Sequence, residues 1–203
     1  MEEKYEIRSF GGDAAPKVSE DRKIWGYAAV FGQESRVMID VIKKRFFIEI
    51  IEPGAITEET LRKCDVKALI DHNRQRMLAR CVNGSGTLTL NVDSMGMGYN
   101  LIAPNTNDGN YAVEMIKRGD IFGSSFAFWT DEKKNVSYEK RNDGIVLRRV
   151  HKIDRVFDVC PVADPAYMGT NVNARSIDAY FEPEKQDESY KNDINLLRNL
   201  INI

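Results

Sequence analysis

The sequence predicts a mostly β protein built on a mostly antiparallel sheet or barrel. Several segments alternate apolar and polar residues with a period of two, which is typical of strands with one buried face. We count about seven such segments, against one clear helix and one short helix. The strands follow one another along the chain and do not alternate with helices, which favours antiparallel pairing over a parallel α/β sheet.

The first half of the chain contains three predicted strands and one short helix. Residues 22–30 alternate regularly, and residues 46–51 are rich in β-prone side chains. A threonine followed by two glutamates predicts a short helix over residues 57–63. Residues 66–72 alternate again and predict a third strand, which ends at His72.

The second half of the chain contains the longest helix and the remaining strands. Residues 87–93 and 96–103 alternate on either side of a turn sequence and predict a hairpin. Residues 106–118 have an apolar stripe at helical spacing and are followed by a glycine, which predicts a helix. Residues 121–130 return to strand character, and residues 145–159 predict one long strand.

Length, charge and hydropathy exclude several classes of protein. The 203 residues suit one domain of ordinary size plus a tail. The net charge of -2 lacks the basic bias of nucleic-acid-binding proteins, so we predict no nucleic-acid partner. No apolar run approaches the roughly 20 residues of a membrane helix, so we predict no membrane association. The first residues lack the basic start and apolar core of a secretory signal, which favours an intracellular protein.

A change of composition near residue 171 divides the chain. Residues 1–170 are predicted to form one domain. Residues 171–203 are rich in Asn, Asp, Glu and Lys and predict a polar C-terminal tail, part-helical or disordered. An apolar stripe near its end fits a short amphipathic helix, but short isolated helices are marginally stable in water.

The three cysteines, Cys64, Cys81 and Cys160, are odd in number and widely spaced. This pattern fits free thiols in a reducing compartment better than a disulfide framework. Cys64, His72 and Cys81 do not have the spacing of a usual zinc site, so we predict no metal. A nucleophilic role for Cys160 is disfavoured, because no lysine or arginine stands beside it to lower its pKa.

The residues that could carry chemistry are a histidine, a serine and a carboxylate. A serine hydroxyl is a weak nucleophile at neutral pH, so an imidazole must take its proton and a third group must orient that imidazole. The chain has only two histidines, His72 and His151. Ser124 and Ser125 open a predicted strand and are the candidate nucleophiles. The third group is Asp158 or, as the alternative, His151.

Strand alternation distinguishes the two serines. Ser124 shares a face with two phenylalanines and is predicted to point into an apolar layer, which favours Ser125 as the accessible hydroxyl and leaves Ser124 as the alternative. Asp158 falls on an apolar face of its predicted strand. A buried carboxylate needs a partner, and the ring N–H of a histidine is a suitable one.

These segments together resemble the prohead protease family of tailed phages, the type found in HK97-like phages. The matching stretches run in the family's order over most of the chain, from about residue 20 to about residue 170. They are WGYAAVFG (25–32), EPGA (52–55), VKALIDHN (66–73), LAR (78–80), GTL (86–88), SSFAF (124–128) and DVCPVADPAY (158–167).

The resemblance implies a herpesvirus-protease type of fold, a small closed antiparallel β-barrel ringed by helices, and the activity of a serine endopeptidase. The histidine of the family's DHN-like motif falls on His72, its serine on Ser125 and its acidic residue on Asp158. The acid is Asp here where Glu is common, and Cys160 replaces a small polar residue of the family motif. Related herpesvirus proteases use a second histidine as the third member, so His151 stays open.

The resemblance also implies the biological setting. The substrates would be phage scaffold and major capsid proteins, cut inside the immature capsid in the host cytoplasm by a phage or prophage product. No cofactor is implied, and a homo-oligomer is allowed. The alternative is a non-catalytic β-barrel protein of capsid assembly, or a scaffold protein, in which His72 and Ser125 would not need to meet.

Overall fold

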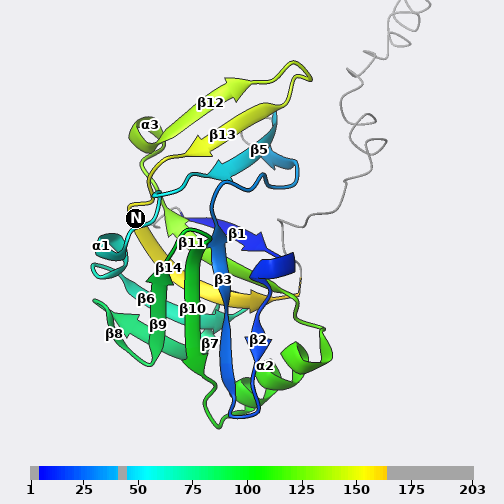
Figure 1. Cartoon of the computed structure of the whole chain (residues 1–203), viewed down its shortest axis with the longest axis vertical. Helices are drawn as coiled ribbons and strands as arrows, with labels where there is room; N and C mark the ends of the chain where they lie inside the picture. The colour runs from blue at the N-terminus through cyan, green and yellow to red at the C-terminus, as the bar shows by residue number, and fades with distance from the viewer. Residues whose placement is uncertain (1–4, 41–44, 164–203) are drawn as a thin grey trace, which may run out of the picture. The chain divides into compact units, whose positions relative to one another are not determined.

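The structure is a computed structural model of the chain, and it describes residues 5–40 and 45–163. Strands predominate in this part of the chain and form three sheets (Figure 1). The prediction of a mostly β fold is therefore confirmed. The boundary of the predicted domain of residues 1–170 and the predicted tail over residues 171–203 lie outside the described residues, and both stay predictions.

The first sheet has six strands and carries the candidate residues. The strand order is β1 (Glu6–Phe10), β11 (Gly123–Trp129), β14 (Arg155–Val162), β6 (Asp65–Ile70), β7 (Asn73–Val82) and β8 (Ser85–Gly86). Neighbouring strands are antiparallel, except that β14 runs parallel to β6. Alternation along a sequence does not say which strands pair, so this parallel contact was not predicted.

The second and third sheets have four strands each. The order in the second sheet is β2 (Lys17–Val18), β3 (Lys23–Val30), β10 (Gly96–Ile102) and β9 (Leu88–Val92). The order in the third sheet is β12 (Val136–Lys140), β13 (Val146–Val150), β5 (Arg45–Ile51) and β4 (Met38–Asp40). In the second sheet, β9 and β10 pair antiparallel and confirm the predicted hairpin. In the third sheet, β13 runs parallel to β5.

The described residues contain three α-helices and one short 3-10 helix. The two predicted helices are confirmed, and both begin after a threonine whose side chain accepts a backbone N–H, Thr57 and Thr106. The longer one ends at Gly119, whose φ of 81° is a left-handed conformation that favours glycine. The four elements are η1 (Gly12–Ala14), α1 (Glu58–Leu61), α2 (Asn107–Arg118) and α3 (Glu132–Asn135).

No sheet closes on itself within the described residues, so the predicted closed antiparallel β-barrel is wrong. The first sheet ends at β1 on one edge and at β8 on the other. The predicted long strand over residues 145–159 is broken, and residues 151–154 belong to no strand. Its first part, β13, joins the third sheet, and its second part, β14, joins the first. At residues 151–154 the chain therefore crosses from the third sheet to the first, where one continuous strand was predicted.

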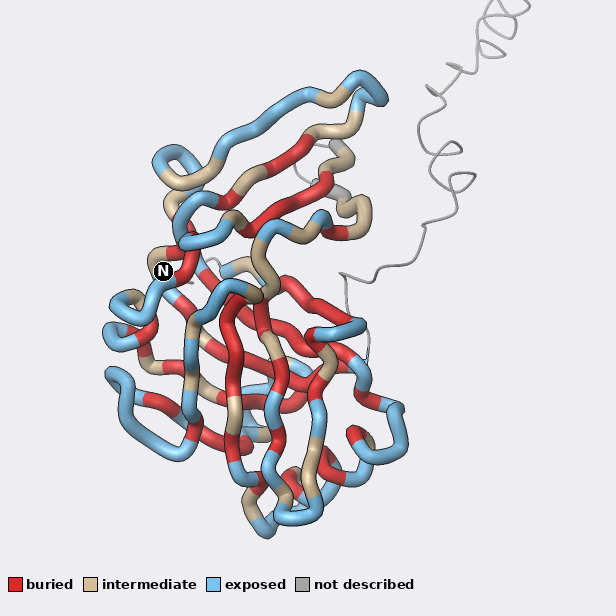
Figure 2. Tube along the Cα trace, viewed as in Figure 1, coloured by how far each residue is buried: buried red, intermediate tan, exposed pale blue. Residues whose placement is uncertain are grey.

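The main hydrophobic core takes residues from the first and second sheets (Figure 2). Phe126 and Phe128 of β11 stack with ring centroids 4.8 Å apart, and the Phe10 ring lies 6.3 Å from Phe126. Ile24 of β3 is fully buried in the same cluster. Because side chains alternate along a strand, the apolar face of β11 leaves Ser125 on the opposite face of the sheet.

A buried carboxylate, Glu49 of β5, connects the third sheet to β1. Glu49 is fully buried, and Arg8 of β1 donates to its two oxygens at 2.6 and 2.9 Å. Arg148 of β13 also donates to Glu49 and, at 2.8 Å, to Glu6. Burial opposes the charge of Arg148, but the carboxylates of Glu49 and Glu6 raise its pKa above the ordinary value. The four charges therefore depend on one another, because a buried ion is costly without its partner.

We expect Glu49→Gln to lower the free energy of unfolding by about 3–5 kcal/mol, because it removes the fully buried carboxylate charge that pairs with both Arg8 and Arg148. Urea denaturation followed by circular dichroism measures the change. The matched control is Glu59→Gln, which breaks an exposed pair with Lys63 on α1 and should change stability by less than about 1 kcal/mol. Equal losses for the two variants would contradict a structural role for the buried group.

Candidate active site

Ser125 lies on β11, the second strand from one edge of the first sheet, with a neighbouring strand on each side. In the register of the sheet it is opposite Ser9 of β1 and opposite Cys160 of β14. Partners that face each other across a ladder project from the same face of the sheet, so the three side chains form a row. Ser125 is fully buried.

His72 occupies a tight turn, where the sequence predicted the end of a strand. The strand β6 stops at Ile70, which pairs with Asn73 of β7, so that Asp71 and His72 form a two-residue hairpin connection. Their φ values are 50° and 54°. Type I′ hairpin turns need positive φ at both central residues, and Asp, Asn and His adopt such values more readily than other non-glycine residues.

The parallel pairing of β6 with β14 brings this turn to Asp158. Asp158 is opposite Lys67 of β6, and the following residue of β14 is opposite Ala68. The turn after β6 therefore lies beside β14, where the backbone N–H of His72 donates to the sulfur of Cys160 at 3.3 Å.

The three predicted residues form one hydrogen-bonded chain. Nδ1 of His72 lies 2.6 Å from Oδ1 of Asp158, and Nε2 of His72 lies 2.7 Å from Oγ of Ser125. The His72 side chain is 16% exposed and that of Asp158 is 11% exposed. A carboxylate on Nδ1 favours the tautomer that carries its proton there, which leaves the lone pair of Nε2 directed at the hydroxyl. The geometry is therefore suited to removing the hydroxyl proton.

Cys160 touches both partners of the contact between His72 and Asp158. Its sulfur is 3.4 Å from both Nδ1 of His72 and Oδ1 of Asp158. Burial raises the pKa of the Cys160 thiol well above its usual range, and the Asp158 carboxylate raises it further. A protonated thiol is a poor nucleophile but can donate to the carboxylate while it accepts from the backbone. Sequence reasoning missed this supporting role, although Cys160 departs from the family motif.

The two alternative residues lie elsewhere. His151 follows β13, and its Nε2 is 2.7 Å from the hydroxyl of Ser137 on β12. Within the described residues, no contact joins His151 to His72 or to Ser125. Ser124 is buried on the core face of β11, where its hydroxyl donates to the carbonyl of Ala14 at 2.9 Å. Because residues 151–154 separate β13 from β14, His151 is not part of the strand that carries Asp158.

In the described part of the chain, one group of residues brings potential metal ligands together. It consists of His72, Asp158 and Cys160, whose ligand atoms all lie within 4.8 Å of one another. In this group Nδ1 and the carboxylate already contact each other at hydrogen-bond distance, and burial raises the pKa of the thiol, which favours its protonated form. Cys64 and Cys81, by contrast, are buried in the main core. The site residues thus interact with one another as an acid–base chain does.

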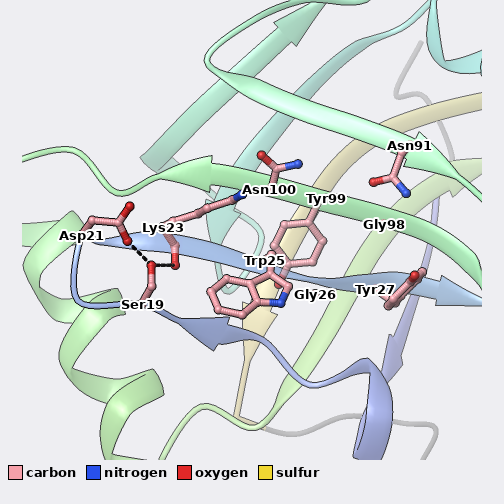
Figure 3. Close-up of a pocket in the computed structure, with 10 residues that line it drawn as sticks. All are labelled: Ser19, Asp21, Lys23, Trp25, Gly26, Tyr27, Asn91, Gly98, Tyr99 and Asn100. Atoms are coloured by element: carbon pink, nitrogen blue, oxygen red, sulfur yellow. Dashed lines mark hydrogen bonds between the residues drawn. The ribbon is translucent and has the colours of Figure 1, made fainter.

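A hollow with a volume of about 410 Å³ lies over the second sheet (Figure 3). Trp25 and Tyr27 of β3 and Asn100 of β10 line it, as does Tyr99. The hydroxyl of Tyr99 reaches Ser124 at 3.0 Å, on the core side of β11. Asp158, His72 and Ser125 are not among the residues that line the hollow.

A carboxylate, an imidazole and a serine hydroxyl joined in this order are the arrangement of the serine hydrolases. A protein-family model described as Caudovirus prohead serine protease matches residues 12–183 of the chain. The match covers most of the sequence, and the chain belongs to this family of serine peptidases. Searches of curated proteins and of solved structures matched nothing.

Family membership confirms several predictions. The chain is a phage-encoded serine peptidase of the kind that acts in capsid maturation within the procapsid. The alternative of a non-catalytic capsid-assembly or scaffold protein is not supported. In the described part of the chain, no helix is both long enough and apolar enough to cross a membrane.

We expect Cys160→Ala to slow the reaction of Ser125 with a fluorophosphonate by roughly tenfold to a hundredfold, because the His72 N–H and the Asp158 carboxylate each lose a partner. Mass spectrometry of the labelled peptide over time measures the rate. Cys160→Ser keeps a donor and an acceptor and should react within a few-fold of the parent. Cys81→Ala, a buried cysteine away from the site, is the control. Parent-like labelling of Cys160→Ala would contradict a positioning role.

Proposed function

We propose that the protein is a serine endopeptidase that cuts the scaffold and major capsid proteins of a phage during maturation of the prohead. Its place of action is the interior of the immature capsid, assembled in the host cytoplasm. Membership of the prohead protease family supports the class of enzyme and a setting within the procapsid. The observation that carries the assignment of residues is the continuous chain from Asp158 through His72 to Ser125, with contacts of 2.6 and 2.7 Å.

In this proposal each residue of the chain has one task. Ser125 Oγ attacks the carbonyl carbon of the scissile peptide while its proton passes to Nε2 of His72. The imidazolium returns this proton to the nitrogen of the leaving amine, and a water molecule then hydrolyses the acyl-enzyme by the same route. Asp158 holds the Nδ1 proton and stabilises the imidazolium. Backbone N–H groups are the donors we expect for the tetrahedral oxyanion.

The remaining features of the enzyme follow from this mechanism. Every step uses groups of the chain, the substrate and water, so the proposal requires no cofactor and no metal. Residues 1–170 would form the protease domain, because all three residues lie within them. Binding of nucleic acid or of a membrane is not part of the proposal. A homo-oligomer is compatible with it.

We expect Ser125→Ala to lower cleavage by roughly 10⁴-fold or more, because it removes the hydroxyl that lies against Nε2 of His72. The assay incubates the purified chain with the scaffold and major capsid proteins of its own phage and follows the products by mass spectrometry. Ser124→Ala is the matched control on the adjacent residue and should leave cleavage near the parent rate. Continued cleavage by folded Ser125→Ala would overturn the assignment.

The third member can be tested with a pair of variants. Asp158→Asn should lower the cleavage rate by roughly 10³- to 10⁴-fold, because an amide in this position favours the wrong tautomer of His72. His151→Ala should leave the rate within about twofold, since its side chain contacts Ser137 and not the chain of three residues. The reverse outcome, with loss of activity only in His151→Ala, would assign the role to His151.

A further inference from the structure

Strand β1 lies beside the nucleophile in the first sheet, and two of its residues contact Oγ of Ser125. Ser9 is opposite Ser125 in the antiparallel ladder, and its hydroxyl donates to Oγ of Ser125 at 2.9 Å. The carbonyl oxygen of Arg8 lies 2.9 Å from the same Oγ. With these two contacts in place Ser125 is fully buried. A buried hydroxyl cannot reach the peptide bond of another polypeptide, so the described arrangement does not admit a substrate to Oγ.

The contact with Arg8 also competes for the proton of the nucleophile. A serine hydroxyl has one proton and can donate one hydrogen bond. Two acceptors lie within reach, Nε2 of His72 at 2.7 Å and the carbonyl of Arg8 at 2.9 Å. A proton directed at the carbonyl is not available to the base. The hydrogen bond from Ser9 further occupies the lone pair with which Oγ would attack.

Strand β1 is anchored at both ends. Arg8 forms a two-pronged contact with the buried carboxylate of Glu49, and such pairs are stronger than single ion pairs. Glu6 accepts from Arg8 at 2.6 Å and from Arg148 at 2.8 Å. At the other end, Phe10 is fully buried in the main core. β1 is nevertheless an edge strand, with β11 as its neighbour in the first sheet, so its release breaks a single ladder.

We infer that the described fold is a latent form of the enzyme, in which β1 acts as an internal inhibitory strand that holds Oγ of Ser125 through Ser9 and Arg8. Activation requires residues 6–9 to move off β11, so that a substrate carbonyl can approach Oγ and the hydroxyl proton turns to His72. The inference rests on the proposed function, since it presupposes that Ser125 is the nucleophile. It predicts opposite effects for variants that tighten and loosen β1.

A reversible lock tests the first direction. Ile7 of β1 and Ala127 of β11 are directly opposite in the ladder, and antiparallel partners are close enough for a disulfide. The double variant Ile7→Cys with Ala127→Cys is labelled with a fluorophosphonate after oxidation and after reduction. We expect the oxidised form to react at least about tenfold more slowly. The parent chain, treated in the same way, controls for its three native thiols.

Loosened variants test the second direction. Arg8→Met removes the anchor to Glu49 and should speed labelling of Ser125 by roughly tenfold or more, because the open form becomes more populated. Glu6→Gln is a milder change at the more exposed anchor and should act in the same direction, which keeps the test valid if Arg8→Met folds poorly. Arg80→Met, which breaks the ion pair of Arg80 on β7 with Asp65 on β6, is the matched control and should react like the parent.

The outcomes separate the inference from the function on which it rests. Faster labelling of the loosened variants with slower labelling of the locked one supports latency. Slower labelling of the loosened variants, or equal rates for the oxidised and reduced lock, shows that β1 positions the site and overturns latency alone. Labelling that persists after Ser125→Ala in the Arg8→Met background shows that another residue reacts, and overturns the proposed function together with the inference.

Discussion

The pairing of β14 with β6 is the constraint on which the site depends. Asp158 belongs to β14, and His72 follows β6 by two residues, so the parallel register decides whether the carboxylate meets the imidazole. The antiparallel register of β14 with β11 then decides whether Ser125 faces the same group. A slip of one residue in either ladder would turn one side chain to the opposite face of the sheet. The site therefore requires both registers at once, and the apolar packing of β11 helps to hold them.

The turn at His72 converts this register into a position for the base. Positive φ values at two successive non-glycine residues cost free energy, of order 1–3 kcal/mol each for such conformations, and they persist only where neighbouring contacts favour them. Here the His72 backbone N–H binds the sulfur of Cys160, and its ring binds Asp158. These contacts stabilise the turn and offset its strain. A longer loop would relieve the strain, but it would leave the imidazole with more conformations to lose when the substrate binds.

The predictions that succeeded concern local features. The hairpin of β9 and β10 and the helix α2 follow from alternation, an apolar stripe and capping residues within a short stretch of chain. The features that were missed depend on distant partners. The break at residues 151–154, the parallel contacts and the edge strand β1 have no local signal that distinguishes them from a continued strand or a loop. A local signal was available at Asp71-His72-Asn73, since three polar residues that tolerate positive φ suit a two-residue turn.

For the candidate site, alternation identified the right face of β11 for each serine, because β11 keeps its regular phase from Ser124 to Ala127. The residues alone left Asp158 and His151 open, and the resemblance to a family favoured Asp158 without excluding the other. The structure distinguishes them, because Nδ1 of His72 contacts Asp158, whereas Nε2 of His151 contacts Ser137. Neither the residue patterns nor the family resemblance predicted the contacts of Ser9 and Arg8 with Ser125, because residues 6–10 were not predicted to form a strand.

The energetics of β1 limit how a latent form could open. Moving the whole strand would expose Phe10, and loss of a buried phenylalanine from a core typically costs about 3–5 kcal/mol. It would also break the contacts of Arg8 with Glu49, a cost that release of residues 6–9 shares. Release of residues 6–9 alone costs less, because Ser9 and Arg8 leave Ser125 while the aromatic ring stays in the core. Phe10 then acts as the fixed end of a short flap. On this argument the exposed nucleophile is reached by local opening of an edge and does not require unfolding of the first sheet.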